Sequence, residues 1–129
     1  MLRGMDHVGI AVSNLERSLA FYQGQLGFEV VERIEVTGFD LTAIFIRLGS
    51  CVIELLDYHV KEGLQRAPAN IFGLRHLTIL VDDMEKAYAE LSAKGVTFTR
   101  PPLEVVPSRV KNAFLADPDG TPIELLQHL

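Results

Sequence analysis

Residues 7–17 read HVGIAVSNLER and residues 76–86 read HLTILVDDMEK, so the same pattern returns 69 positions later. The paired residues differ in kind at three positions: Gly9 and Thr78, Ala11 and Leu80, and Ser13 and Asp82. The ends of the two halves match as well, because Ile-Glu-Leu-Leu at residues 53–56 recurs unchanged at residues 123–126. A repeat of this kind predicts two copies of one structural unit, of almost equal length.

Each repeat predicts one strand followed by one helix. Capping residues place the start of the first helix at Ser13 or Asn14, and the start of the second at Asp82 or Asp83. Apolar side chains then follow at helical spacing, namely Leu15, Leu19, Tyr22 and Leu26 in the first half and Met84, Ala87, Tyr88 and Leu91 in the second. Both helices are therefore expected to be amphipathic and to cover a sheet.

Three further strands are predicted after each helix, at residues 28–36, 42–48 and 51–57 and at residues 96–99, 110–116 and 121–128. Each half is thus a βαβββ module, and the predicted fold class is α+β with two tandem modules. We expect module 1 at about residues 1–57, a connection at about 58–74 and module 2 at about 75–129, within a single domain. Residues 100–109 contain three prolines, which predicts a loop that shapes ligand access rather than a strand.

The composition is typical of a globular protein without a nucleic-acid or membrane partner. Of the 129 residues 48% are hydrophobic and 22% are charged, and the net charge of -5 disfavours binding to a phosphate backbone. No stretch reaches the roughly 20 apolar residues of a membrane span, and the first residues do not resemble a signal peptide, so we expect a cytoplasmic location. Cys51 lies in an apolar run and is expected to be a buried, unreactive thiol.

Two histidines are predicted to face open space rather than the core. Alternation puts the bulky residues of HVGIAV on one face of the first strand and leaves His7 beside Gly9 and Ala11 on the other. Side chains this small leave room for a ligand. His76 takes the same position in the second copy, so the geometry is expected to repeat.

Two glutamates lie in the middle of apolar strands, where an unpaired carboxylate would be costly. Glu54 and Glu124 occupy the same place in the two Ile-Glu-Leu-Leu segments, and the sequence sets no arginine or lysine beside them. One divalent cation would satisfy both carboxylates and both imidazoles. We therefore predict a single metal site formed by His7, Glu54, His76 and Glu124. Nitrogen and oxygen ligands suit zinc, nickel, cobalt, manganese or ferrous iron.

The pattern resembles the vicinal oxygen chelate superfamily, which includes glyoxalase I, methylmalonyl-CoA epimerase, fosfomycin-resistance proteins, extradiol dioxygenases and bleomycin-resistance proteins. The resemblance rests on DHVGIAV followed by NLERSLAFYQGQLGF, on VIELL, on GLRHLTILVDDMEKAYAELSAKGV and on AFLADPDGTPIELLQ, and it covers nearly the whole chain. It implies that the two modules form an incomplete barrel around the metal, with the family's ligand positions at the same four residues. It also implies that chains pair as homodimers.

The likeness to glyoxalase I implies a metal-dependent lyase or isomerase that acts on a small oxygenated substrate through an enediolate-like intermediate. A bound cation would stabilise the developing oxyanion. One ligand glutamate would move the adjacent proton, with Glu124 as the first candidate and Glu54 as the second, because apolar surroundings make a carboxylate a stronger base. Ala11 stands where glutathione-using glyoxalases often carry an arginine, which argues against glutathione as a cosubstrate.

Two other functions stay open. A methylmalonyl-CoA epimerase-type isomerase typically shows a His-His pair at the third ligand and an amide at the second, whereas this chain has Arg75-His76 and Glu54. An epimerase also needs a second acid/base, for which Glu35 is the candidate. A non-catalytic protein that binds a small molecule or an antibiotic, like the bleomycin-resistance proteins, would not need a complete ligand set.

Other polar residues are expected to have no special role. Extradiol dioxygenases use additional His and Tyr groups, but Tyr58, His59 and His128 are interpreted here as loop or C-terminal surface residues. The arginines near strand ends could meet an anionic substrate, yet we expect ordinary surface charges at Arg47, Arg66, Arg75, Arg100 and Arg109.

Overall fold

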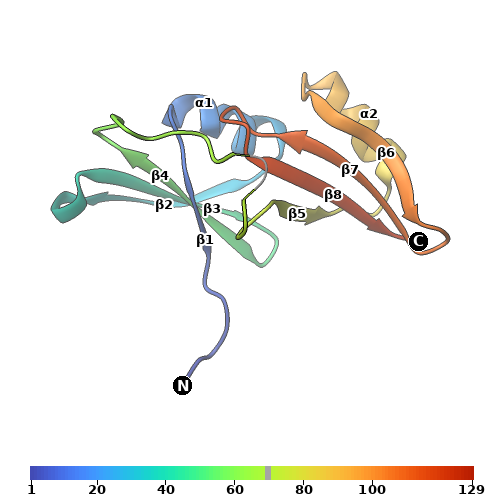
Figure 1. The fold of residues 1–129 in the computed structure, drawn as a ribbon, viewed down its shortest axis with the longest axis horizontal. Coiled ribbons are helices and arrows are strands. Elements are labelled where there is room, and N and C mark those ends of the chain that lie inside the picture. The colour runs from blue at the N-terminus through green and yellow to red at the C-terminus, as the bar shows by residue number, and fades with distance from the viewer. Residues whose placement is uncertain (69–70) are drawn as a thin grey trace. The chain divides into compact units, whose positions relative to one another are not determined.

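The computed structural model describes residues 1–68 and 71–129 of the chain. It divides into two compact units, Met1–Leu64 and Gln65–Leu129. Each unit contains one four-stranded sheet with its helical segments (Figure 1). The predicted α+β class with two βαβββ modules is confirmed, and the boundary between the units falls inside the predicted connection.

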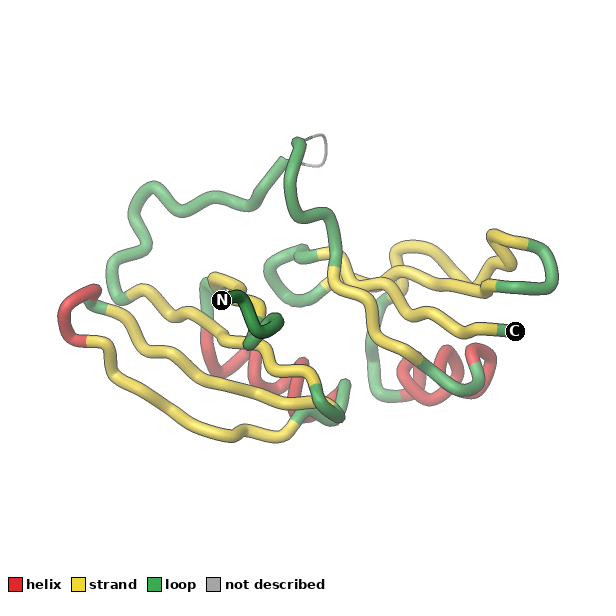
Figure 2. The backbone as a smooth tube through the Cα atoms, turned by 90° about the horizontal axis from the view of Figure 1, so that it is seen from below, coloured by secondary structure: helices red, strands yellow, loops and turns green. Residues whose placement is uncertain are grey.

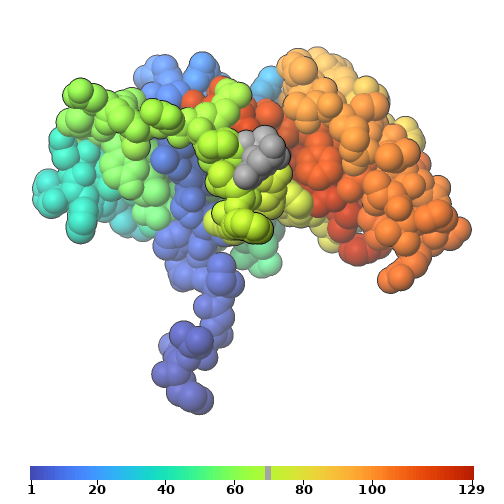
Figure 3. Space-filling view, viewed as in Figure 1, coloured from blue at the N-terminus to red at the C-terminus, as the bar shows by residue number. Residues whose placement is uncertain are grey.

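The first unit contains, in order, β1 (Val8–Ala11), α1 (Leu15–Leu19), η1 (Ala20–Gln25), β2 (Glu29–Val36), η2 (Thr37–Phe39), β3 (Leu41–Leu48) and β4 (Cys51–Tyr58). The segment η1 is a π-helical continuation of α1, and η2 is a short 3-10 turn. The strand order is β1-β4-β3-β2, with β1 parallel to β4 and the other pairs antiparallel. Residues 1–6 are exposed and project away from this unit (Figure 3).

The core of the first unit lies between the sheet and the helix, which runs along one face of the strands (Figure 2). Ile10, Leu55 and Tyr22 are buried there, as alternation and helical spacing predict. Burial of an apolar side chain of this size contributes about 1.5–3 kcal/mol. The backbone N–H of Arg17 donates to Oδ1 of Asn14 at 3.0 Å, so the second of the two cap candidates starts α1.

The second unit contains, in order, β5 (Leu77–Leu80), α2 (Met84–Ala93), β6 (Phe98–Val106), β7 (Val110–Ala116) and β8 (Pro122–His128). Its strand order is β5-β8-β7-β6, and β5 is parallel to β8, which repeats the arrangement of the first unit. Asp83 caps α2 by accepting from the backbone N–H of Lys86 at 3.0 Å. The side chains of Met84, Leu115, Ile123 and Leu125 are fully buried in this unit.

The prediction of a loop at residues 100–109 was wrong, because β6 extends through Pro101 and Pro102 to Val106. Proline lacks the N–H that an interior strand must donate, but an edge strand has one side that needs no partner. The strand β6 lies at the edge of its sheet, and its pairing with β7 is interrupted by register shifts on both sides of the prolines. The irregular edge therefore accommodates residues that would disrupt a central strand.

Cys51 was expected to be buried, and the structure shows it exposed. It shares the alternation of the buried residues Ile53 and Leu55, but it is the first residue of β4, opposite Leu48 at the end of β3. The turn residues Gly49 and Ser50, just before it, are exposed as well. Among the described residues, no helix is long and apolar enough to cross a membrane.

Candidate metal centre

Strand register brings equivalent side chains together in both units. In the first unit Glu54 pairs with Gly9 on β1 and with Phe45 on β3. In the second unit Glu124 pairs with Thr78 on β5 and with Phe114 on β7. Residues directly opposite one another share a face of a sheet. Each glutamate therefore lies on the face that does not pack on the helix.

His7 lies just before β1 and contacts a carboxylate with each ring nitrogen. Its Nε2 is 3.0 Å from Oε2 of Glu54, and its Nδ1 is 2.7 Å from Oδ2 of Asp6. The hydrogen bond to Asp6 raises the pKa of the His7 imidazole above its ordinary value, although partial desolvation opposes the shift. The ring meets Phe45 edge-on, with centroids 5.2 Å apart, so three groups fix its orientation.

His76 repeats this arrangement in the second unit. Its Nε2 is 3.1 Å from Oε2 of Glu124, and its ring meets Phe114 edge-on with a centroid separation of 5.4 Å. The two pairs predicted from the repeat, His7 with Glu54 and His76 with Glu124, are thus brought together within their own units.

Glu124 accepts hydrogen bonds from two neutral side chains, and the described residues provide none of this kind at Glu54. Thr78 donates through Oγ1 to Oε2 of Glu124 at 2.8 Å, and Asn112 donates through Nδ2 to Oε1 at 2.5 Å. Burial alone would raise the pKa of Glu124, but these hydrogen bonds and the nearby His76 outweigh it and hold the pKa below its ordinary value. The expectation that apolar surroundings would strengthen this base was therefore wrong, because polar neighbours replace water.

Each pair brings together one imidazole nitrogen and one carboxylate oxygen, which are donor types that zinc and related ions bind. The Nε2 to Oε2 distances are 3.0 and 3.1 Å, which are hydrogen-bond distances, so each imidazole is held against its carboxylate. Asp6 on the far nitrogen of His7 is the kind of partner that orients a ligating imidazole. Over residues 1–68 and 71–129, no group of three or more His, Cys, Asp or Glu side chains forms a ready metal site. Each unit thus offers two donor atoms of the kind that metals bind, and we call each His–Glu pair a half-site.

Several residues at these half-sites were missed in the sequence. Phe45 and Phe114 occupy equivalent positions, 69 residues apart, and alternation along β3 and β7 puts them on the face of the glutamates. The repeat and the alternation could therefore have predicted both phenylalanines from the sequence. Asn112 was harder to find, because its counterpart in the first half is Ala43, and only the register of β7 with β8 shows which residues it adjoins.

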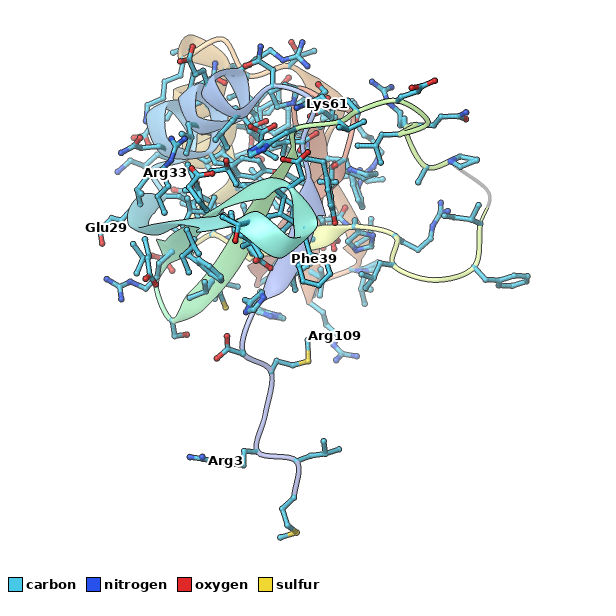
Figure 4. The ribbon with its side chains drawn as sticks, turned by 90° about the vertical axis from the view of Figure 1, so that its left-hand side faces the viewer. Arg3, Glu29, Arg33, Phe39, Lys61 and Arg109 are labelled. Atoms are coloured by element: carbon cyan, nitrogen blue, oxygen red, sulfur yellow. The ribbon has the colours of Figure 1, made fainter. Side chains whose placement is uncertain are left out.

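Glu35 was the candidate for a second acid/base, and the structure places it elsewhere. It pairs with Thr42, which is on the helix-facing side of the sheet with Ile44 and Ile46. The Glu54 carboxylate is on the opposite side, so Glu35 does not adjoin it. Thr42 donates to Glu35 at 2.7 Å and contacts Nε2 of His59 at 2.8 Å. The segment η2, which joins the strands of Glu35 and Thr42, ends at Phe39, labelled in Figure 4.

The remaining polar candidates have local roles, with one exception. Nδ1 of His59 contacts Asp40 at 2.9 Å, Tyr58 ends β4 and His128 is an exposed residue at the end of β8. Arg47 pairs with Glu29 at 3.5 Å, and Arg109 is exposed in the turn between β6 and β7 (Figure 4). Arg100 differs, because it is half-buried beside Phe114 on the face that carries Glu124.

The fold and the paired contacts define a class of protein in which two βαβββ repeats each present one histidine and one glutamate. The chain belongs to the Glyoxalase/Bleomycin resistance protein/Dioxygenase superfamily, whose model matches residues 4–125. The resemblance found in the sequence is thereby confirmed.

The proteins that this chain is similar to in sequence are named for different activities, or for none. It is 35% identical to the Bacillus subtilis "Uncharacterized protein YwkD", over 98% of both chains. It is 31% identical to the "Probable lactoylglutathione lyase" of Vibrio cholerae, over 95% of this chain and 88% of that one. Human mitochondrial methylmalonyl-CoA epimerase is 33% identical over 71% of this chain, but the match spans 54% of the epimerase.

Solved structures agree with this assignment. The glyoxalase family protein from Enterococcus faecalis superimposes with a TM-score of 0.84 at 30% identity, covering 96% of this chain and 97% of that chain. The superfamily includes lyases and an epimerase, so family membership alone leaves the reaction open.

Proposed function

We propose that the protein is a metal-dependent lyase or isomerase of the glyoxalase I type, acting on a small oxygenated substrate through an enediolate-like intermediate. The observation that carries this proposal is the repeated His–Glu pair, with nitrogen and oxygen 3.0 and 3.1 Å apart in the two units. His7, Glu54, His76 and Glu124 would together hold one zinc, nickel, cobalt, manganese or ferrous ion. The 31% identity to a Vibrio cholerae protein named as a lactoylglutathione lyase supports the reaction class.

The proposed chemistry divides between the ion and the side chains. A bound divalent cation would polarise a carbonyl oxygen and stabilise negative charge that develops on it. One glutamate would take the proton from the neighbouring carbon, and Asp6 would keep Nε2 of His7 directed at the ion. The phenyl rings of Phe45 and Phe114 would limit the movement of the two imidazoles.

The hydrogen bonds favour Glu54 over Glu124 as the base, which reverses the order preferred from the sequence. Both oxygens of Glu124 accept hydrogen bonds, from Asn112 and Thr78, so this carboxylate is held in place. Glu54 contacts His7 and lies beside Gly9, where a side-chain carbon would come within 3.6 Å of its Oε2. We propose that Glu124 serves as a fixed ligand and that Glu54 moves the proton.

The two alternative functions have less support. An epimerase needs a second acid/base, and Glu35 is on the wrong face of its sheet for that role. A binding protein without a metal would not need two repeated His–Glu pairs. We further propose a cytoplasmic homodimer, which light scattering of the purified protein and cell fractionation would test.

Metal analysis combined with deuterium exchange tests the proposal. Protein purified without chelators should contain about one divalent ion per chain, and it should exchange the α proton of a hemithioacetal of an α-ketoaldehyde for deuterium. Glu54→Gln should keep the metal with weakened affinity and lose exchange, whereas Glu124→Gln should lose the metal itself. Glu29→Gln, at an exposed surface ion pair, is the control. A wild-type protein that binds none of zinc, nickel, cobalt, manganese and ferrous iron would refute the mechanism.

A further inference from the structure

We infer that Arg100 recognises an anion beside the His76–Glu124 pair, and that the substrate therefore carries a carboxylate or phosphate group apart from its metal-binding oxygens. The inference deepens the proposed function and rests on it for the end of the substrate that meets the metal. The role of Arg100 itself rests on contacts within the second unit.

Strand register places Arg100 on the face of the sheet that carries Glu124. Arg100 pairs with Phe114, and Phe114 pairs with Glu124, so the three residues form one row across β6, β7 and β8. Neighbouring strands are about 4.8 Å apart, which separates the backbones of Arg100 and Glu124 by about 10 Å. One substrate could span this distance.

The guanidinium of Arg100 is held in place by neutral groups. It lies 5.3 Å from the centre of the Phe114 ring, Nη2 donates to Oδ1 of Asn112 and Nη1 donates to the carbonyl of Pro101 at 3.3 Å. A guanidinium has five N–H donors in a planar fork, so three remain for a ligand after these two contacts. A fork of this kind matches the oxygens of a carboxylate or phosphate.

The positive charge of Arg100 has no carboxylate partner among the described residues. Other strand arginines do have one: Nε of Arg33 is 3.3 Å from Glu35, and Nη2 of Arg47 is 3.5 Å from Glu29. Arg100 is more buried than either of these. A half-buried guanidinium without a carboxylate partner keeps N–H donors that a carboxylate or phosphate can accept from.

The first unit shows that the charge at this position is not a requirement of the fold. The β2 residue that pairs with Phe45 is Glu32, so the first unit has an acidic side chain where the second has Arg100. Both units keep the contact between histidine and phenylalanine and the contact between histidine and glutamate. On a chain with a net charge of -5, a positive group at one half-site would attract an anion to that side specifically.

The neighbours of Arg100 define the rest of the expected ligand. Leu103 on β6 pairs with Asn112, and Asn112 pairs with Leu126, so apolar side chains adjoin the polar row on the same face. A ligand with vicinal oxygens at one end, a short apolar spacer and an oxyanion at the other end would match this surface. Neutral oxygenated compounds would lack the last contact.

The first experiment tests Arg100 without any metal. In the metal-free protein, glutarate should shift the ¹⁵N–¹H signal of the Arg100 side chain in a saturable manner, and the neutral diamide of glutarate should not. The same titration with acetate and with methyl phosphate shows which oxyanion the site prefers. In Arg100→Gln, where the side-chain amide signal of the neighbouring Asn112 is followed instead, binding of glutarate should weaken about 10- to 100-fold. It should be unchanged in Arg109→Gln, which removes an exposed charge of the same unit.

The second experiment tests whether one compound contacts both Arg100 and the metal. By calorimetry, the metal-loaded protein should bind 2-oxoglutarate at least about 10-fold more tightly than 2-oxopentanoate, which has the same vicinal oxygens without the distal carboxylate. Arg100→Gln should bind the two compounds equally. Equal binding of the two compounds by the wild type, or binding of glutarate by Arg100→Gln with the wild-type affinity, would overturn the inference. A protein that takes up no metal but shows the specific glutarate shift would refute the proposed function and leave Arg100 as an anion site.

Discussion

At the scale of single residues, the two histidines differ in the residue that precedes them. In His7 this residue contacts Nδ1, the ring nitrogen that does not contact the glutamate. Nδ1 of His7 contacts Asp6 at 2.7 Å, whereas the residue before His76 is an arginine. We predict that Asp6→Ala weakens metal binding about 10-fold or more, because loss of a carboxylate behind a ligating imidazole typically has an effect of this size. Competition with a chelator measures it. Asp82→Ala, an exposed position, should bind metal as the wild type does.

A second residue-scale prediction concerns pH at the Glu35 cluster. The hydrogen bond from Thr42 is the largest cause that holds the pKa of Glu35 below its ordinary value, and Arg33 contributes less. A carboxyl with a lowered pKa in the folded state stabilises the fold above its unfolded pKa, and this contribution is lost as the pH falls through the folded pKa. Carbon-detected NMR titration should show a raised pKa for Glu35 in Thr42→Val and a smaller rise in Arg33→Gln. A larger rise in Arg33→Gln would contradict this account.

At the scale of elements, the helix starts are set by the second of two adjacent capping residues. The Asn14 and Asp83 side chains accept the backbone N–H three residues later, each at 3.0 Å. We expect Asn14→Ala and Asp83→Ala each to lower the free energy of unfolding by about 1 kcal/mol. Urea denaturation measures this. Asp82→Ala serves as the control, and a loss there as large as in Asp83→Ala would show that the cap is wrongly assigned.

The elements also show which parts of the fold could be predicted from the sequence alone. Alternation predicted the strands and the faces of His7 and Ile10, since a period of two residues depends on the chain itself. The course of β6 was not predicted, because a proline is tolerated only where a strand is at an edge, and edge position follows from the assembled sheet. Asn112 and Thr78 were missed as partners of Glu124 for the same reason: they come from other strands.

At the scale of the whole molecule, the duplicated repeat explains why each unit has one contact between a histidine and a glutamate. One imidazole and one carboxylate are fewer than the four ligands that zinc usually takes, so the single ion that we propose would need the ligands of both units. The repeats have diverged around a shared arrangement, with Gly9 and Ala43 in one and Thr78 and Asn112 in the other. The glutamate of the second unit therefore accepts hydrogen bonds from Thr78 and Asn112, for which Gly9 and Ala43 offer no side-chain donor in the first unit.

If one ion is held by both units, single substitutions in either unit should have the same consequence. An ion at 100 times its dissociation constant stabilises the folded state by about 2.7 kcal/mol. We predict that His7→Ala and His76→Ala each remove this stabilisation, and that the double variant loses no more than either single one. Thermal unfolding at graded metal concentrations measures all four proteins, and His128→Ala, at an exposed position, is the control. Two independent half-sites would give a different result, since each single variant would keep part of the stabilisation and the double variant would lose the sum.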